Sequence, residues 1–188
     1  MTKRTLALAI YLAGTAAYAG QPQEKLTVYV KNTAMVSSPD LMYAEAVATK
    51  MFSSIGVTVQ WRSGKPAGDF SLPPVYVEFV TGTPADRKPG ALAFALPYEG
   101  SHLTVFYDRI KTNFFPRSLL AHVLVHEITH LLEGVDRHSV TGVMKAHWNT
   151  DEYLAMRMGT LPFAPEDVEL IHDGLTGRAR RLVATATR

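Results

Sequence analysis

HEITHLLEGVDRH, residues 126–138, ends the longest helical pattern in the chain. Apolar side chains recur along one side of residues 118–134, which predicts a buried helix with Ser118 as its N-cap and Gly134 at its C-terminal end. The quoted stretch also holds three histidines, two glutamates and one aspartate. So many coordinating side chains at the end of a buried helix indicate a chemical site, around which the rest of the chain can be placed.

His126 and His130 are the first candidate metal ligands. They are four residues apart, so on a helix both imidazoles project from one face about one turn apart, close enough to bind one metal ion. Glu127 is rotated part of the way around the helix, so its carboxylate can reach a water beside that metal without being a ligand. This HExxH spacing brings a Lewis acid and a general base to one water, and it predicts a Zn²⁺ site with Glu127 as the catalytic base.

The segments before this helix alternate between strand and helix patterns. Apolar residues alternate over 25–31, a helix start follows at Ser38, Gly56 ends that helix, and the alternation resumes at Val57. Strand, helix and strand joined by short connections form a βαβ unit, so the two strands are expected to be parallel with a right-handed crossover. Further strands are expected at 75–80, 91–96 and 103–107, and a last helix near Pro165. We therefore predict an α/β fold.

The N-terminal stretch MTKRTLALAIYLAGTAAYA, residues 1–19, has the layout of a secretory signal peptide. Two basic residues precede an apolar run, and small residues precede a cleavage site expected after Ala19. The sequence thus predicts a bacterial protein that is secreted or periplasmic, without a stable membrane anchor, because the apolar run is too short to span a bilayer. A single folded domain is expected over 20–177, followed by a flexible basic tail over 178–188.

The charge balance argues against a nucleic-acid partner. Removal of the signal peptide takes away two of the 19 basic residues and none of the 17 acidic ones, which leaves the remainder formally neutral. No basic stripe interleaved with aromatic residues is present, so we expect no nucleic-acid binding. The chain has no cysteine, so its stability must come from the core and from a bound metal instead of disulfides.

The run HEITHLLEGVDRHSVTGVM, residues 126–144, resembles the metzincin zinc peptidases, whose motif is HExxHxxGxxH followed by a methionine-containing turn. The order of strands and helices over 25–175 is similar as well. The resemblance implies an α+β, zincin-like domain with a mixed, mostly parallel five-stranded sheet, an active-site helix and a C-terminal helix. It also implies that 91–97 is an antiparallel edge strand beside the substrate, and that Met144 is the methionine beneath the zinc.

The third metal ligand is where the sequence departs from the metzincin motif. Gly134 follows the second histidine by four residues instead of three, so Asp136 occupies the numerical position of the third ligand and a histidine arrives only at His138. Compact bacterial secreted metzincin-like proteins, which this spacing resembles most, use the histidine before a serine. Because Gly134 is the residue able to turn the chain out of the helix, the return to the metal should also start later. We predict His138, with Asp136 and Glu152 as alternatives.

Other side chains near the motif carry weaker expectations. His122 lies one turn before the first ligand and is expected beside the site or at the surface, because a fourth protein ligand would close the metal to water. Glu133 is expected to face solvent. His147 and Trp148 are expected to line a substrate pocket or to pack beneath the methionine turn, and Tyr153 is a candidate for stabilising an oxyanion.

These patterns predict a secreted zinc-dependent metalloendopeptidase, monomeric, that acts on a peptide or protein substrate. Glu127 would take the proton of the attacking water and deliver it to the leaving amine. Two alternatives remain open at the level of sequence. One is a gluzincin-type peptidase that uses Glu152 as the third ligand, and the other is a non-catalytic, zinc-binding secreted protein with a peptidase-like fold.

Overall fold

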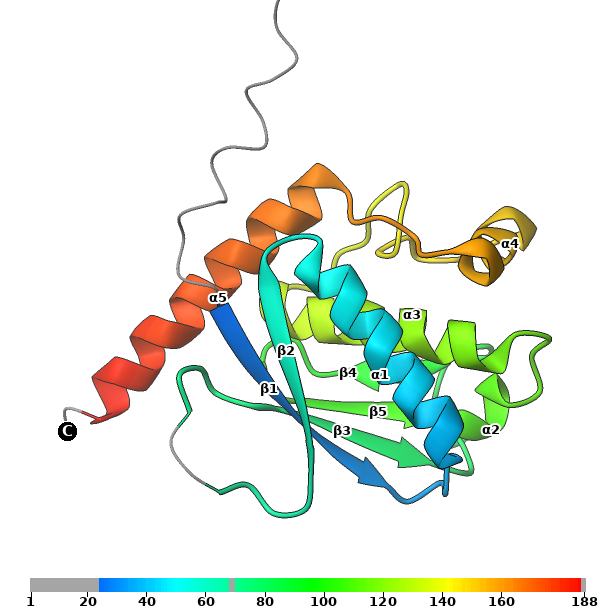
Figure 1. The fold of residues 1–188 in the computed structure, drawn as a ribbon, viewed down its shortest axis with the longest axis horizontal. Coiled ribbons are helices and arrows are strands. Elements are labelled where there is room, and N and C mark those ends of the chain that lie inside the picture. The colour runs from blue at the N-terminus through cyan, green and yellow to red at the C-terminus, as the bar shows by residue number, and fades with distance from the viewer. Residues whose placement is uncertain (1–23, 68–69, 187–188) are drawn as a thin grey trace, which may run out of the picture.

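The computed structural model describes residues 24–67 and 70–186, which form one five-stranded sheet with helices packed against it (Figure 1). The predicted signal peptide, residues 1–19, lies outside the described residues. The strands follow the order β2-β1-β3-β5-β4 across the sheet. They are β1 (Glu24–Asn32), β2 (Val57–Ser63), β3 (Val75–Val80), β4 (Ala93–Ala95) and β5 (His102–Phe106).

The strand pairing confirms the predicted mixed, mostly parallel sheet. β1 runs parallel to both β2 and β3, β3 runs parallel to β5, and β4 runs antiparallel to β5 at the edge of the sheet. The antiparallel edge strand therefore lies where the resemblance placed it, although it spans three residues instead of the expected 91–97. β5 ends one residue earlier than predicted, because the chain turns into a short helix at Tyr107.

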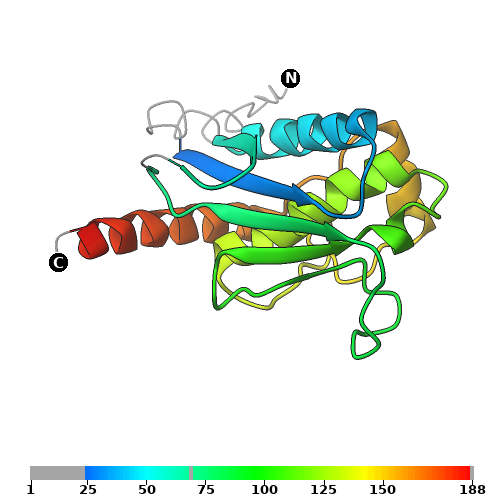
Figure 2. The ribbon, with the colours of Figure 1, turned by 90° about the horizontal axis from the view of Figure 1, so that it is seen from below.

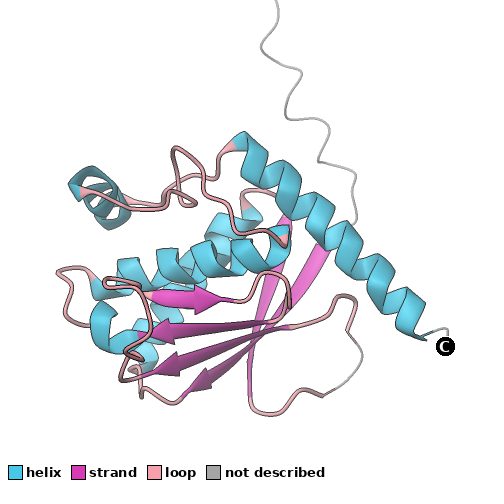
Figure 3. Cartoon of the chain, turned by 180° about the vertical axis from the view of Figure 1, so that it is seen from behind, coloured by secondary structure: helices cyan, strands magenta, loops and turns pink. Residues whose placement is uncertain are grey.

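Two long helices cover one face of the sheet. α1 and α3 lie side by side on that face in both views (Figures 1 and 2). Seen from behind, the sheet lies in front of these helices (Figure 3). The helices are α1 (Ser38–Ser53), α2 (Tyr107–Ile110), α3 (Pro116–Glu133), α4 (Thr150–Met158) and α5 (Pro165–Ala186).

The alternation along β1 explains this layering. Leu26, Val28 and Val30 are buried beneath the helices, as the period of two predicts for one face of a strand. Tyr29 points to the other face and stacks on Tyr76, with ring centroids 5.9 Å apart and an interplanar angle of 22°. The helix-covered face therefore holds the aliphatic core, and the opposite face carries an aromatic pair.

The helix that carries the HExxH motif ends as predicted but begins earlier. Its C-cap is Gly134, which adopts a left-handed conformation with φ 69°. Its first turn includes Pro116, which fits there because the missing N–H has no helical partner, and Phe115 occupies the N-cap position. Ser118 is thus inside the first turn, and its carbonyl oxygen lies 2.7 Å from Nδ1 of His122.

The C-terminal part of the chain is more helical than predicted. α4 was not anticipated; it begins with a capping box in which Asn149 and Glu152 satisfy each other's backbone N–H groups. α5 continues to Ala186, so residues 178–186, where a flexible tail was expected, are helical. Arg178 is 3% exposed and its guanidinium donates hydrogen bonds to the carbonyl oxygens of Pro73 and Gly100, which dock this part of α5.

Within residues 24–67 and 70–186, no helix combines the length and the apolar character needed to cross a membrane.

Candidate metal centre

Three histidine side chains converge where α3 ends. His126 and His130 come from the last two turns of α3, and His138 comes from the loop that follows Gly134. Each offers one nitrogen, and these three atoms all lie within 4.8 Å of one another. The centroid of the His138 ring is 5.3 Å from that of His126 and 4.9 Å from that of His130. The structure thus brings together the three residues predicted as ligands.

Backbone carbonyls orient the two helix-borne rings. Nδ1 of His126 lies 2.8 Å from the carbonyl oxygen of Val143, and Nδ1 of His130 lies 3.4 Å from that of Val135. Because a carbonyl can only accept, each Nδ1 carries the proton and each Nε2 is left with a free lone pair. The sequence carried no signal for these carbonyls, since any residue type supplies one.

The geometry of the free nitrogens fits a tetrahedral metal ion. The two Nε2 atoms face each other at 3.1 Å, with both protons already placed on the opposite ring nitrogens. Nitrogens that lie about 2.0–2.1 Å from one tetrahedral zinc would be roughly 3.3 Å apart, so only a small adjustment separates this pair from a zinc-binding pair. A shared cation would also remove the repulsion between the two lone pairs.

The surroundings of the three histidines favour the neutral form, which is the form that binds metals. Burial lowers the pKa of His126 to about 3, with the neighbouring rings of His130 and His138 adding to the effect. The pKa values of His130 and His138 are also lowered, in both cases mainly by burial. The site therefore offers a metal ion neutral imidazoles at pH 7 without first having to release protons.

Glu127 lies half-buried between α3 and β4. Burial raises the pKa of its carboxyl to about 8, the backbone N–H of Ala95 opposes that shift by a hydrogen bond, and the charge of Asp136 adds to it. A carboxyl group with a pKa near neutrality can both accept and donate a proton under working conditions. The structure thus places a candidate proton carrier on the strand-facing side of the histidine group.

The free edge of β4 faces this carboxyl. Leu96 donates to the carbonyl of His102 at 3.2 Å, and Phe106 donates to that of Leu92 at 2.9 Å, so Ala93 and Ala95 lie at positions that turn their main-chain groups away from β5. The contact between Ala95 and Glu127 shows that this edge lies against α3. Apart from the Ala95 N–H, which donates to Glu127, the outward main-chain groups of β4 have no partner strand at this edge of the sheet.

Among the described residues, neither alternative third ligand joins the three histidines in the set of converging ligand atoms. Asp136 is exposed and is not part of the set of converging ligand atoms in the described chain. Glu152 uses one carboxylate oxygen to accept from Nζ of Lys145 at 2.7 Å and the other to accept from the backbone N–H of Asn149 at 2.8 Å. Its role in the structure is to begin α4.

A solved structure shares this fold. Archaemetzincin from Methanopyrus kandleri superposes on the chain with a TM-score of 0.52, over 82% of this chain and 96% of the archaemetzincin chain. The sequences are 15% identical across that match, so the likeness to archaemetzincin is one of fold. No protein-family model matches the sequence, and no curated protein sequence matches it.

The loop that carries Met144 contacts the histidine group through Val143, whose carbonyl oxygen lies 2.8 Å from Nδ1 of His126. Met144 is fully buried, and its carbonyl oxygen accepts from the backbone N–H of Ser139 at 2.8 Å. Trp148 stands edge-on to His126, with ring centroids 5.5 Å apart, so it supports the ring by packing. His147 is exposed, and Tyr153 is half-buried.

Two polar side chains of α3 are more buried than a surface position allows. His122 is buried, and burial lowers its pKa; its Nδ1 lies against Ser118 and its Nε2 accepts from the backbone N–H of Leu161 at 3.1 Å, which ties α3 to the segment before α5. The expectation that Glu133 faces solvent is wrong. Its side chain is fully buried beneath α5, 3.5 Å from the guanidinium of Arg137.

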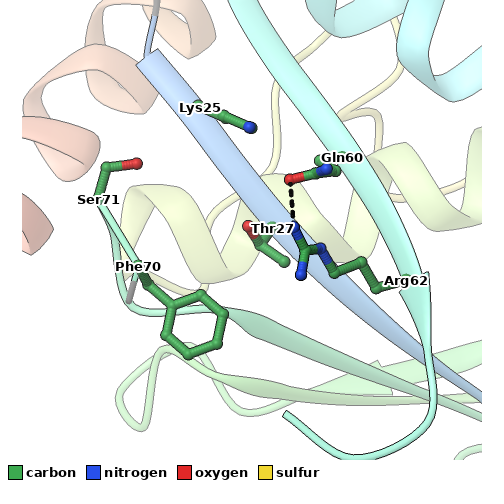
Figure 4. A pocket seen from close by; sticks show the side chains of 6 residues that line it. All are labelled: Lys25, Thr27, Gln60, Arg62, Phe70 and Ser71. Carbon is green, nitrogen blue, oxygen red and sulfur yellow. Dashed lines mark hydrogen bonds between the residues drawn. The ribbon is translucent and has the colours of Figure 1, made fainter. Parts of the chain in front are cut away.

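A separate pocket lies on the helix-free side of the sheet, between β1, β2 and the loop that precedes β3 (Figure 4). None of the predicted site residues lines it. The lining side chains are Lys25, Thr27, Gln60, Arg62, Phe70 and Ser71.

Proposed function

We propose that this protein is a zinc-dependent metalloendopeptidase of the metzincin type that acts after export. The observation that carries the proposal is the convergence of three neutral histidines beside a glutamate with a raised pKa, next to an unpaired strand edge. The fold shared with archaemetzincin supports the same class of protein. The proposed ligands are His126, His130 and His138.

Zn²⁺ suits this set of donors, because imidazole nitrogens and a tetrahedral geometry are what zinc sites commonly use. Three protein ligands leave one position open for water or substrate, which is the pattern of catalytic zinc rather than structural zinc. When bound, the ion would supply Lewis-acid chemistry, polarising a carbonyl oxygen and making a nearby water more acidic.

Glu127 would carry the proton. Its carboxylate accepts the proton of the attacking water and later delivers it to the amine that leaves when the peptide bond breaks. The buried setting that raises the pKa of Glu127 favours the protonated form needed for the second step. The hydrogen bond from the Ala95 N–H holds the carboxyl in place against the strand.

The edge of β4 would hold the substrate. An extended peptide can pair with the outward N–H and C=O groups of Ala93 and with the C=O group of Ala95, as an additional strand of the sheet, while the Ala95 N–H donates to Glu127. Because these contacts involve only backbone groups, they would orient many peptide sequences alike. The scissile bond would then lie between this edge and the histidine group.

The test compares two glutamine variants on a diverse mixture of quenched fluorescent peptides. Glu127→Gln is expected to lose roughly 10²- to 10⁴-fold in rate while it retains one zinc per chain, because it removes only the proton carrier. Glu169→Gln, an exposed glutamate on α5, is the matched control and is expected to cleave at the wild-type rate.

Two outcomes would contradict the proposal. One is a Glu127→Gln variant that cleaves as fast as the wild type. The other is a zinc-loaded wild type that cleaves no peptide of the mixture, which would favour a zinc-binding protein without turnover.

A further inference from the structure

The buried carboxylate of Asp167, on α5, binds the residues on both sides of His138. Arg137 donates from Nη1 to Oδ1 of Asp167 at 2.9 Å, and the hydroxyl of Ser139 donates a short hydrogen bond to the same oxygen. Arg137 also donates from Nη2 to Oγ of Ser139 at 3.2 Å, which closes the three groups into a ring of contacts. The residues on either side of His138 are therefore fixed to one point on α5.

Asp167 is itself fixed. It is fully buried, and its second oxygen, Oδ2, accepts from the backbone N–H of Ala164 at 3.0 Å, at the start of α5. Both carboxylate oxygens thus have partners, as burial of a charge requires. The first turn of α5 and the loop of His138 share this single group.

Two other carboxylates approach Arg137, but neither reaches both neighbours of His138. Glu166 accepts from Nη2 of Arg137 at 2.8 Å and has a side chain that is 76% exposed, so solvent weakens that ion pair. Glu133 lies 3.5 Å from Arg137 and accepts no hydrogen bond in the described part of the chain. Asp167 is the member of the group that links Arg137 to Ser139.

His138 needs such support more than its two companions do. His126 and His130 are held by helix geometry and by backbone carbonyls, and both are buried. His138 lies outside any helix and is exposed, so its position depends on the loop that carries it. A ligand side chain that is mobile before the metal binds lowers the metal affinity, because binding must then order it.

We propose that Asp167 is a positioning residue for His138: by clamping Arg137 and Ser139 it presets the loop so that the third nitrogen reaches the metal. The inference rests on the proposed function in that it takes His138 as a ligand. It makes the docking of α5 a determinant of metal affinity, although α5 supplies no ligand.

The experiment measures zinc affinity of the full chain by competition with a chromophoric chelator. Asp167→Asn is expected to weaken zinc binding by about 10- to 100-fold, the range typical for groups that orient metal ligands. Ser139→Ala should weaken it by a smaller factor, because Arg137 still reaches Asp167, and this variant serves if Asp167→Asn does not fold. Asp173→Asn, the same change at an exposed position of α5, is the control and should bind zinc as the wild type does.

A double-mutant comparison separates positioning from a general loss of structure. If Asp167 acts through His138, then Asp167→Asn adds nothing to His138→Ala, and the double variant has the zinc affinity of the single one. A further loss in the double variant would overturn the inference. Unchanged zinc affinity in Asp167→Asn and Ser139→Ala, with only a lowered unfolding temperature of the zinc-free protein, would overturn it as well.

These outcomes are distinct from failure of the proposed function. A wild type that binds zinc at the three histidines but cleaves no peptide would contradict peptidase activity. The role of Asp167 would still be tested by the zinc affinities of its variants.

Discussion

The two sides of the histidine group are built in different ways. His126 and His130 stand on a buried helix whose four-residue spacing sets their separation, whereas His138 stands on a loop whose path is set by contacts far away in the sequence. On the helix side, a local pattern is enough to place two donors. On the loop side, the donor is placed only when α5 has docked. The difference predicts that the two sides will respond differently to substitution.

The largest effect is expected from loss of a helix-borne donor. Loss of a group that orients a ligand can weaken metal binding by about 100-fold. His126→Ala and His138→Ala should each weaken zinc binding by more than that, because each removes a direct ligand. The loss should be greater for His126→Ala, since it breaks the prearranged pair and leaves two donors from different segments. Zinc competition titrations of both variants check this order. Wild-type affinity in His138→Ala would remove the loop from the metal site.

The helix side can be broken without touching a ligand. A Cβ on Gly174 of α5 would lie 1.7 Å from the carbonyl oxygen of Leu132 on α3, so Gly174→Ala should push the two helices apart and cost about 3 kcal/mol of unfolding free energy. Gly177→Ala is the matched control on the same helix. Its Cβ would meet only the end of the Arg181 side chain at 3.8 Å, and it should stabilise by about 0.5–1 kcal/mol. Urea unfolding of the zinc-free proteins gives both values, and equal effects would contradict the close approach.

The stability of the zinc-free protein should depend on pH through Glu133, which is buried where α3 meets α5. Burial, followed by the charge of Asp167, raises the pKa of Glu133 to about 7, against the opposing effect of Arg137. A raised carboxyl pKa means that the folded state holds the proton more tightly, so the stabilisation is fully present below the unfolded value near 4.5 and is lost as pH rises through 7. Between pH 5 and pH 8 the zinc-free wild type should therefore lose about 1–2 kcal/mol more stability than Glu133→Gln. Parallel pH dependence of the two proteins would show that Glu133 is ionised throughout.

The smallest effect is expected on the loop side, at the residue after Val143, whose carbonyl oxygen orients His126. Met144 is fully buried, and leucine has a similar volume, so Met144→Leu should cost less than about 1.5 kcal/mol and leave one zinc per chain. Thermal unfolding together with metal analysis tests both parts. Loss of zinc from a folded Met144→Leu variant would give the methionine a more direct role than packing.

The same division explains which features the sequence could predict. The βαβ unit, the end of α3 at Gly134 and the face shared by His126 and His130 all follow from local periodicity or from one residue's backbone preference. The choice of His138 over Asp136 rested on the resemblance to compact bacterial metzincin-like proteins and on where the chain leaves the helix, and the structure brings His138 and not Asp136 into the group.

The features that were missed depend on contacts between distant segments. Glu133 looked like an exposed helix residue, and it is buried because α5 packs over it. The last part of α5 looked like a basic tail, and Arg178 is buried because carbonyls of Pro73 and Gly100 accept its hydrogen bonds. α4 has a local signal in its capping box, Asn149 and Glu152, but the sequence interpretation considers Glu152 only as a possible metal ligand.

The free edge of β4 has a consequence for the peptide substrate that we propose. Only a chain whose own N–H and C=O groups are free can pair with Ala93 and Ala95, and a segment within a helix or an inner strand has already used those groups. A folded protein would have to open locally before it could be held there. Its resistance to cleavage would then measure how often that region unfolds, more than which residues it contains.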